Sequence, residues 1–405
     1  MANVFNFCGK IALGKQTDKF SPIDRREFNS GWTNTTLKFN CISGTNRILC
    51  TSQGGKWVDD KKNVIKTFGK STTDENGKVT KGETIEIPWA KRFDEDQIDK
   101  VAGFRKFVCD TGDTRMRYKL QNLINALENG SVTDEMIEEV GIDNIEDAKT
   151  ALEKPVSKKK IFLSEWDFAE HLAKVAQSEK FRNKLFYISG TYDIQYNADK
   201  DRFYTNYHVN RVVLAPDDAV PSTEFKIDFY FSEGACDDSS YDETGKAILN
   251  GWTNYYDASL KKTGFKDIAI AVREDEKKLN ALMRKFNIEG DEVKQIGLTL
   301  NVIEGAERVE ITMEMLDEET REDIEAGLLD FEDVKRELGG KVVGDKLSEL
   351  RFVELTPKKN TVQDTMYNVD DMHPAKVEIV ENEDDTEDVN FDIFDDNDDD
   401  LDDDL

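Results

Sequence analysis

Two neighbouring segments decide the fold class: Leu185-Phe-Tyr-Ile-Ser-Gly-Thr-Tyr-Asp-Ile-Gln-Tyr196 and Arg202-Phe-Tyr-Thr-Asn-Tyr-His-Val-Asn-Arg-Val-Val-Leu214. Both are rich in aromatic and β-branched residues, which favour strands. The short segment between them, Asn197-Ala-Asp-Lys-Asp201, carries the residue types of a hairpin loop. The sequence therefore predicts a β-hairpin over residues 185–214.

Similar stretches lie on both sides of this hairpin, separated by turn signals. The expected strands are 4–13, 35–42, 47–51, 83–89, 103–109, 225–231, 247–252, 265–272, 298–303, 309–312 and 347–355. Helical patterns interrupt them at 117–127, 133–140, 145–152, 164–177, 274–286 and 318–338. The connection at 58–82 is rich in Lys, Gly and Thr and is expected to be flexible.

The chain is therefore expected to be mainly β with helical insertions (α+β). We expect a first, basic domain over residues 1–215 with a helical insertion at about 117–180. A linker rich in Pro and Asp follows, then a second, acidic domain over 222–357 with a helical pair, and a disordered linker with an acidic tail over 358–405.

Two internal echoes suggest a duplication but do not settle it. Gly31-Trp-Thr-Asn34 recurs as Gly251-Trp-Thr-Asn254. In the helical patches, a constant offset matches Gly141 with Gly327, Glu146-Asp147 with Glu332-Asp333, Lys149 with Lys335 and Leu152 with Leu338. Acidic helix pairs can converge on such patterns, so common descent of the two halves stays open.

Charge is unevenly distributed along the chain. The 405 residues include 84 Asp and Glu against 55 Lys and Arg, a net charge of −29. Residues 381–405 hold 15 of the acidic residues and no cation, whereas residues 1–120 hold 22 cations against 15 acids. A basic first third is thus joined to an acidic tail, and residues 215–380, near −17, lack the basic groove expected of a second nucleic-acid-binding domain.

The sequence shows no long apolar run and no signal peptide, and its five cysteines lack metal-site spacing. We expect a cytoplasmic protein, in the host cytoplasm if it is viral, with reduced thiols and no membrane association. Three scattered histidines and the absence of Gly-x-Ser-x-Gly or Cys-x-x-Cys motifs give no catalytic or metal site. We therefore expect no enzyme activity, no cofactor and no metal.

Aromatic residues alternate with cations along the predicted strands of the first domain. Unpaired nucleic acid needs this mixture, because cations follow the phosphates while flat rings stack on bases without reading their identity. About half of these rings are expected in the core, because alternate side chains of a strand point inward. The candidate contacts with single-stranded DNA are Trp32, Lys38, Phe39, Arg47, Trp57, Arg92, Phe104, Arg105 and Lys106.

The tail of residues 381–405 is too charged to fold alone. Its apolar residues are spaced like small anchors for a basic partner groove: Phe391, Ile393, Phe394, Leu401 and Leu405. A solubilising role is the plainer alternative. A negative tail can also occupy a basic groove and be displaced by phosphates.

The basic, strand-rich first domain with its aromatics, together with the tail, resembles the phage and bacterial single-stranded DNA-binding proteins of the OB-fold. The many acidic helices and few prolines are similar in style to proteins of large tailed bacteriophages. The resemblance implies tandem OB-like barrels, sequence-independent binding of single-stranded DNA, and a tail that recruits replication or recombination proteins. Bacterial members end in Pro-Phe after the acidic run, whereas this chain ends Asp402-Asp-Asp-Leu405.

Two other functions stay open. A viral structural or scaffolding protein would use its acidity against aggregation and would not bind nucleic acid. A nucleic-acid mimic that blocks a DNA-binding enzyme would need a continuous negative face on the folded domains, against which the positive balance of residues 1–120 argues.

Overall fold

The computed structural model describes residues 3–17, 20–73, 79–112, 114–153, 158–216, 218–257, 260–273, 276–290, 292–308, 313, 316–331, 334, 343–357 and 359–375. The acidic segment 381–405 lies outside the described residues, and with it the predicted anchors Phe391, Ile393, Phe394, Leu401 and Leu405.

In its described residues, the first part of the chain contains twelve strands and five α-helices. The strands are β1 (Val4–Ala12), β2 (Ile23–Glu27), β3 (Trp32–Ser43), β4 (Asn46–Trp57), β5 (Val64–Phe68), β6 (Thr72–Thr73), β7 (Val79–Thr80), β8 (Thr84–Pro88), β9 (Phe107–Asp110), β10 (Lys159–Phe162), β11 (Leu185–Asn197) and β12 (Arg202–Leu214). The helices are α1 (Glu95–Lys100), α2 (Thr114–Asn129), α3 (Asp134–Val140), α4 (Ile145–Glu153) and α5 (Glu165–Ala176), with short 3₁₀ turns η1 (Asp60–Lys62), η2 (Trp89–Lys91), η3 (Gly103–Arg105) and η4 (Glu179–Phe181).

The second part repeats the strand-rich pattern. Its strands are β13 (Ser222–Phe231), β14 (Cys236–Asp237), β15 (Ala247–Asp257), β16 (Lys262–Val272), β17 (Glu292–Arg308), β18 (Val343–Leu355) and β19 (Gln363–Asn368). Its helical elements are α6 (Tyr241–Thr244), α7 (Glu276–Phe286), α8 (Glu318–Glu325) and η6 (Val369–Asp371). The expected fold class, mainly β with helical insertions, is confirmed.

Five strands of the first part close a barrel. β1 pairs antiparallel with β3 and β11, β3 with β4, and β11 with β12, while the parallel pairing of β4 with β12 closes the ring. In chain order the third and the fifth strands are therefore the parallel neighbours, which is the OB arrangement of a small Greek-key barrel. Helix α5 lies between the third and fourth strands in the chain and packs against β3 and β4.

A second barrel has the same strand order. β13 pairs antiparallel with β15 and β17, β15 with β16, and β17 with β18, and β16 runs parallel to β18. Helix α7 again lies between the third and fourth strands, and its Phe286 ring packs edge-on against Phe229 and Phe231 in the core. The fold is thus a tandem of OB-like barrels.

The two barrels are joined through their first strands. The first half of β1 pairs antiparallel with the first half of β13, with Phe5 opposite Phe225, and the second half of each strand turns to its own barrel. This pairing relates the barrels by an approximate two-fold axis. One hydrophobic core runs through both, and it includes Phe7, Phe39 and Phe229.

These segments form strands because buried and more exposed side chains alternate along them. In β3 the buried side chains are Thr35, Leu37, Phe39, Cys41 and Ser43, and the residues between them are half-buried. The predicted hairpin over residues 185–214 is confirmed as β11 and β12, whose pairing runs without a break from Asn197 and Arg202 to a bulge near Gly190.

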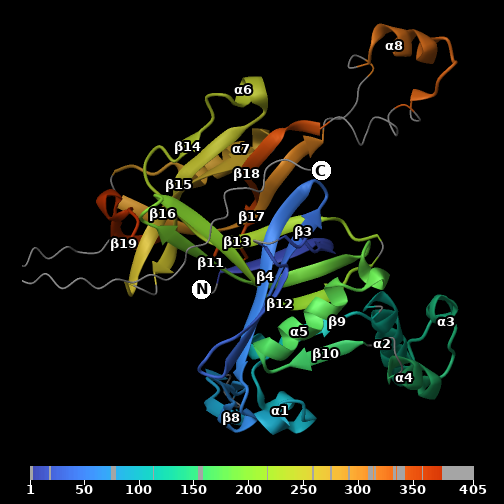
Figure 1. The fold of residues 1–405 in the computed structure, drawn as a ribbon. Coiled ribbons are helices and arrows are strands. Elements are labelled where there is room, and N and C mark those ends of the chain that lie inside the picture. Colours follow the sequence, from blue (N-terminus) through green and yellow to red (C-terminus); the bar gives the residue numbers. More distant parts are fainter. Residues whose placement is uncertain are drawn as a thin grey trace, which may run out of the picture.

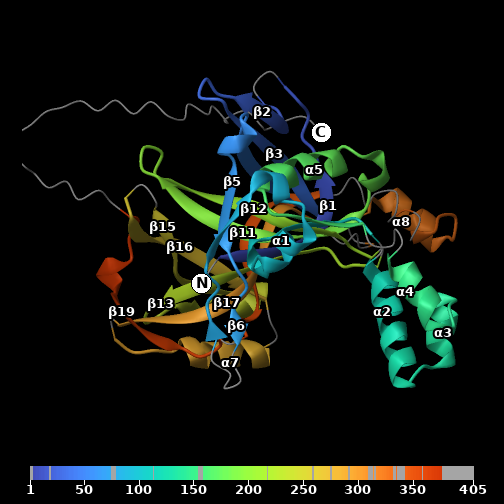
Figure 2. The ribbon, with the colours of Figure 1, turned by 90° about the horizontal axis from the view of Figure 1, so that it is seen from below.

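Two insertions extend from the first barrel. The segment from Val58 to Lys106, called the arm, carries β5 to β8 and α1 at the far end of the β3–β4 hairpin (Figure 1). Helices α2, α3 and α4 form a separate bundle beside the barrel, around the buried side chains of Leu120, Leu123, Ile124 and Ala148 (Figure 2).

Three expectations about local structure need correction. The connection at 58–82 was expected to be flexible, but β5 pairs with β8, and Ile87 packs with Val101 and Leu163. Residues 359–375 were assigned to a disordered linker, but β19 pairs with β17, and Met372 is buried against the second barrel. The expected strand at 309–312 lies outside the described residues, after the longer strand β17.

The two sequence echoes do not mark equivalent positions. Cys50 begins the parallel pairing of the first barrel, and Ile270 begins the equivalent pairing of the second barrel. Counting along the antiparallel strands from these two residues makes Trp252 the counterpart of Ile42, and not of Trp32. The helices α2 to α4 lie between the third and fourth strands of their barrel, whereas α8 lies between the fourth and fifth. The duplication is therefore visible in the topology and not in these echoes. Among the described residues, no helix is long and apolar enough to cross a bilayer.

Candidate nucleic-acid interface

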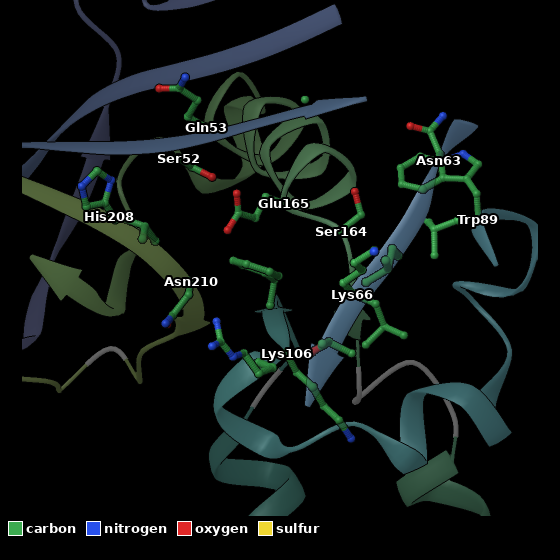
Figure 3. A pocket seen from close by; sticks show the side chains of 18 of the residues that line it. Ser52, Gln53, Asn63, Lys66, Trp89, Lys106, Ser164, Glu165, His208 and Asn210 are labelled. Atoms are coloured by element: carbon green, nitrogen blue, oxygen red, sulfur yellow. The ribbon is translucent and has the colours of Figure 1, made fainter. Parts of the chain in front are cut away.

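A cavity opens in the first barrel where β4 and β12 separate. These strands pair only at Cys50 with Tyr207 and at Thr51 with His208, after which β12 pairs with β9 from Arg211 to Val213. The start of α5 and the arm enclose the gap (Figure 3). We call this cavity, with a volume of about 620 Å³, the fork.

The fork has a buried floor and an accessible rim. Ser52, Ser164 and Trp89 line it with less than a tenth of their surface exposed. At the rim, 73% of Phe104 is exposed. Other lining rings are those of Trp32, Trp57 and Phe107. A flexible chain with flat groups can thus reach the rim.

Two consecutive glycines on β4 allow the walls to approach. A Cβ atom on Gly54 would lie 2.2 Å from the backbone nitrogen of Trp166, at the start of α5. A Cβ atom on Gly55 would lie 2.3 Å from the Trp32 ring, which covers that glycine. Trp32 also packs edge-on against Trp57 with a centroid distance of 5.2 Å. The helix and the tryptophan pair therefore need glycine at both positions.

Four cationic side chains line the fork: Lys62, Lys66, Arg105 and Lys106. The Arg105 guanidinium lies over the rings of Phe68, at 5.0 Å, and Phe104, at 5.4 Å. Lys66 forms an ion pair with Glu86 at 3.1 Å, but both side chains are exposed, so a phosphate can replace Glu86 at little cost. Positive charge and exposed rings therefore lie together.

Lys106 lies near other charged side chains. Desolvation is the main cause that lowers the pKa of Lys106; Lys70 and Lys159 lower it further, while Asp99 raises it. Like charges held close together favour the arrival of an anion, which relieves their repulsion. The positive field thus extends from the fork towards Lys70 and Lys159.

His208 adds a titratable group to the fork. Its Nε2 atom bonds to the Asp193 carboxylate, and Asn206 donates a second hydrogen bond to Asp193 at 3.2 Å. The hydrogen bond to Asp193 raises the pKa of His208 against the opposing effect of burial. Burial raises the pKa of Asp193, but its hydrogen bonds outweigh that effect and the net pKa is lowered.

Seven of the nine predicted contacts are accessible. Trp32, Trp57, Phe104, Arg105 and Lys106 line the fork. Lys38 lies opposite Thr51 and Arg47 opposite Ile42, which places both on the outward face of the β3–β4 hairpin, beyond the fork. Trp32 and Trp57 share this outward face, so the hairpin continues the candidate surface away from the cavity.

Two predicted contacts are corrected. Phe39 is fully buried in the barrel core, because it alternates with the outward-facing Lys38, so its ring cannot meet a ligand. The Arg92 guanidinium bonds to Asp167 of α5 at 2.7 Å and stacks on Trp89. Arg92 therefore ties the arm to the helix and does not line the fork.

Sequence reasoning missed several residues of the fork. Lys62 and Lys66 lie in the connection expected to be flexible, and His208 and Asn210 lie on the predicted hairpin but are not of the residue types that the aromatic–cation pattern selects. The parallel pairing of β4 with β12 brings His208 and Asn210 to the site, and the arm brings Lys62 and Lys66. Among the residues that the structure describes, no group of three His, Cys, Asp or Glu side chains is placed to hold a metal ion.

No protein-family model and no curated protein sequence matches the chain. Among solved structures, it is similar to the wild-type single-stranded DNA-binding protein from Thermus aquaticus, with 9% identity and a TM-score of 0.27 over 74% of this chain and 85% of that one. A deletion mutant of the same protein gives 8% identity and a TM-score of 0.25 over 74% and 87%. At these values the comparison carries no argument, and the fold assignment rests on the strand pairings.

Proposed function

We propose that the chain binds single-stranded DNA independently of sequence in DNA replication or recombination, through the fork and the outward face of the β3–β4 hairpin. The observation that carries the proposal is the convergence of four cations and several aromatic rings on one cavity of an OB-like barrel. Cations follow the phosphates, and rings accept unpaired bases, so a single strand satisfies both.

The shape of the site favours a single strand over a duplex. Phe104 and Phe68 are exposed, and both rings lie close to the Arg105 guanidinium, so an unstacked base can lie on either ring. Each such stacking contact is worth roughly 1–3 kcal/mol. The bases of a duplex are already stacked and paired, so they cannot use these rings without first opening.

The acidic part of the chain takes a separate role in the proposal. Residues 381–405 would recruit replication or recombination proteins through Phe391, Ile393, Phe394, Leu401 and Leu405, and would compete with DNA for the basic site. Deleting residues 381–405 should then tighten binding of a labelled dT oligonucleotide at low salt. Unchanged affinity would argue against the competition and leave the fork assignment intact.

The direct test is a titration of the full chain with labelled single-stranded and duplex DNA. We expect binding of the single strand, and weaker binding after Arg105→Ala. Arg182→Ala is the matched control, because it removes an exposed guanidinium, paired with Glu179, outside the fork. A protein that ignores dT with and without its tail contradicts the proposal and favours a structural role.

A further inference from the structure

One group in the fork has no place in simple phosphate binding. Glu165, the first residue of α5, points its carboxylate into the middle of the cavity, towards the space between β4 and β12 (Figure 3). A carboxylate repels phosphate. The cations of the fork favour a polyanion, so the Glu165 carboxylate must contact a group of the ligand other than phosphate.

Glu165 is not part of a structural ion pair. Helix α5 has three acidic residues, of which Asp167 is held by Arg92 at 2.7 Å and Glu170 by Arg25 at 2.7 Å. Within the described part of the chain, no hydrogen bond or ion pair involves the Glu165 side chain. An acid in the first helical turn complements the helix dipole, but Asp167 and the capping hydroxyl of Ser164 already serve that turn.

The surroundings of Glu165 suit a neutral hydrogen-bond donor. The cavity walls desolvate the carboxylate and raise the pKa of Glu165, while His208 and Arg105 lower it by a smaller amount. These two groups also have other contacts, since His208 bonds to Asp193 and the Arg105 guanidinium lies over the rings of Phe68 and Phe104. The Glu165 side chain is nevertheless exposed, so a ligand that donates to both carboxylate oxygens can reach it without bringing negative charge.

Among the four DNA bases, guanine presents such a group. Its Watson–Crick edge carries two adjacent donors, N1–H and the N2 amino group, which match the two oxygens of a carboxylate. Thymine places its N3–H between two carbonyl oxygens, which repel a carboxylate, and the amino groups of cytosine and adenine stand beside an acceptor nitrogen. Unpaired bases in single strands expose this edge for reading.

We infer that Glu165, whose side chain is exposed to the fork, binds the Watson–Crick edge of one guanine of the bound strand. This inference rests on the proposed function, and it adds a preference at one position to binding that otherwise ignores sequence. The cations and rings of the fork hold the backbone and neighbouring bases, while Glu165 meets the edge of a single base.

The test compares dT oligonucleotides that carry one central guanine, inosine, cytosine or no substitution, titrated against the full chain. We expect about tenfold tighter binding with guanine than with thymine, the scale of one good bidentate base contact. Inosine lacks the N2 amino group, so it should fall between the two. Because total affinity also depends on charge, the ratio between guanine and thymine is the readout.

The variant Glu165→Gln should bring this ratio close to one, because an amide offers a single acceptor. Glu179→Gln is the control for loss of an acidic charge outside the fork, and it should keep the ratio. Equal affinity for all substituted strands, or an unchanged ratio in Glu165→Gln, overturns the guanine contact alone. Absence of binding to every oligonucleotide overturns both this inference and the proposed function.

Discussion

The salt dependence of binding gives the sharpest quantitative prediction. Each phosphate neutralised on a single strand releases counterions, and log K falls by about 0.7 per log unit of salt for each such contact. The four cations of the fork, Lys62, Lys66, Arg105 and Lys106, therefore predict a slope of about −2.8 if each meets one phosphate. The slope becomes steeper if Lys38 and Arg47, on the outward face of the hairpin, also take part.

The perturbation is the double variant Arg105→Ala/Lys106→Ala, which removes two of the four charges. Its slope should be shallower by about 1.4, twice the single-contact value. Between roughly 50 and 200 mM salt, four contacts predict about a fiftyfold loss of affinity and two contacts about a sevenfold loss. Both side chains lie at the cavity rim, so the barrel core stays intact.

The assay is fluorescence anisotropy of a labelled dT oligonucleotide at several salt concentrations, with Arg182→Ala as the control. Circular dichroism of each variant verifies that it is folded. A double variant that binds more weakly with the slope of the unaltered protein would refute the assignment of phosphates to these two cations. A slope near zero in the unaltered protein would refute electrostatic binding altogether.

Three further predictions follow from single residues. Phe104→Ala should weaken binding by roughly 1–3 kcal/mol, the value of one stacked base, and leave the melting temperature unchanged because the ring is mostly exposed; a loss of stability without a loss of affinity would contradict this. Phe39→Ala should lower the free energy of unfolding by about 3–5 kcal/mol in urea denaturation, because it empties a fully buried site of the barrel core. The hydrogen bond to Asp193 raises the pKa of His208, so its positive charge is present below that raised value and is lost as the pH rises through it; affinity should fall over the same range, and a His208→Asn variant should not show that step.

The local pattern of the sequence was sufficient to predict the strands, but it was insufficient to predict how the barrel closes. The hairpin β11–β12 agrees with its prediction because each strand alternates between core and surface. The pairing of Cys50 with Tyr207 joins segments far apart in the chain, and no local pattern specifies it. That pairing and its early end create the fork, so the cavity could not be predicted.

The same reasoning explains where single residues lie in the structure. Lys38 and Phe39 are neighbours on one strand, so only one of them can face outward, and the buried ring is the phenylalanine. The Lys, Gly and Thr content of the arm predicts flexibility, yet Ile87 and Val101 pack against Leu163, which lies just before α5. Strand alternation alone predicts that Lys38 and Phe39 face opposite sides of the sheet. Contacts between distant segments determine which of these sides is buried, and they also hold the arm in place.

The central claim, that single-stranded DNA occupies the fork, can be tested by tryptophan fluorescence. The chain has five tryptophans, of which Trp32, Trp57 and Trp89 line the fork, whereas Trp252 lies on the second barrel. Titration with dT should quench the emission, and the quenching should persist in Trp252→Phe and fall strongly in Trp32→Phe/Trp57→Phe. Quenching that survives in the double variant and disappears in Trp252→Phe would place the DNA on the second barrel and contradict the account.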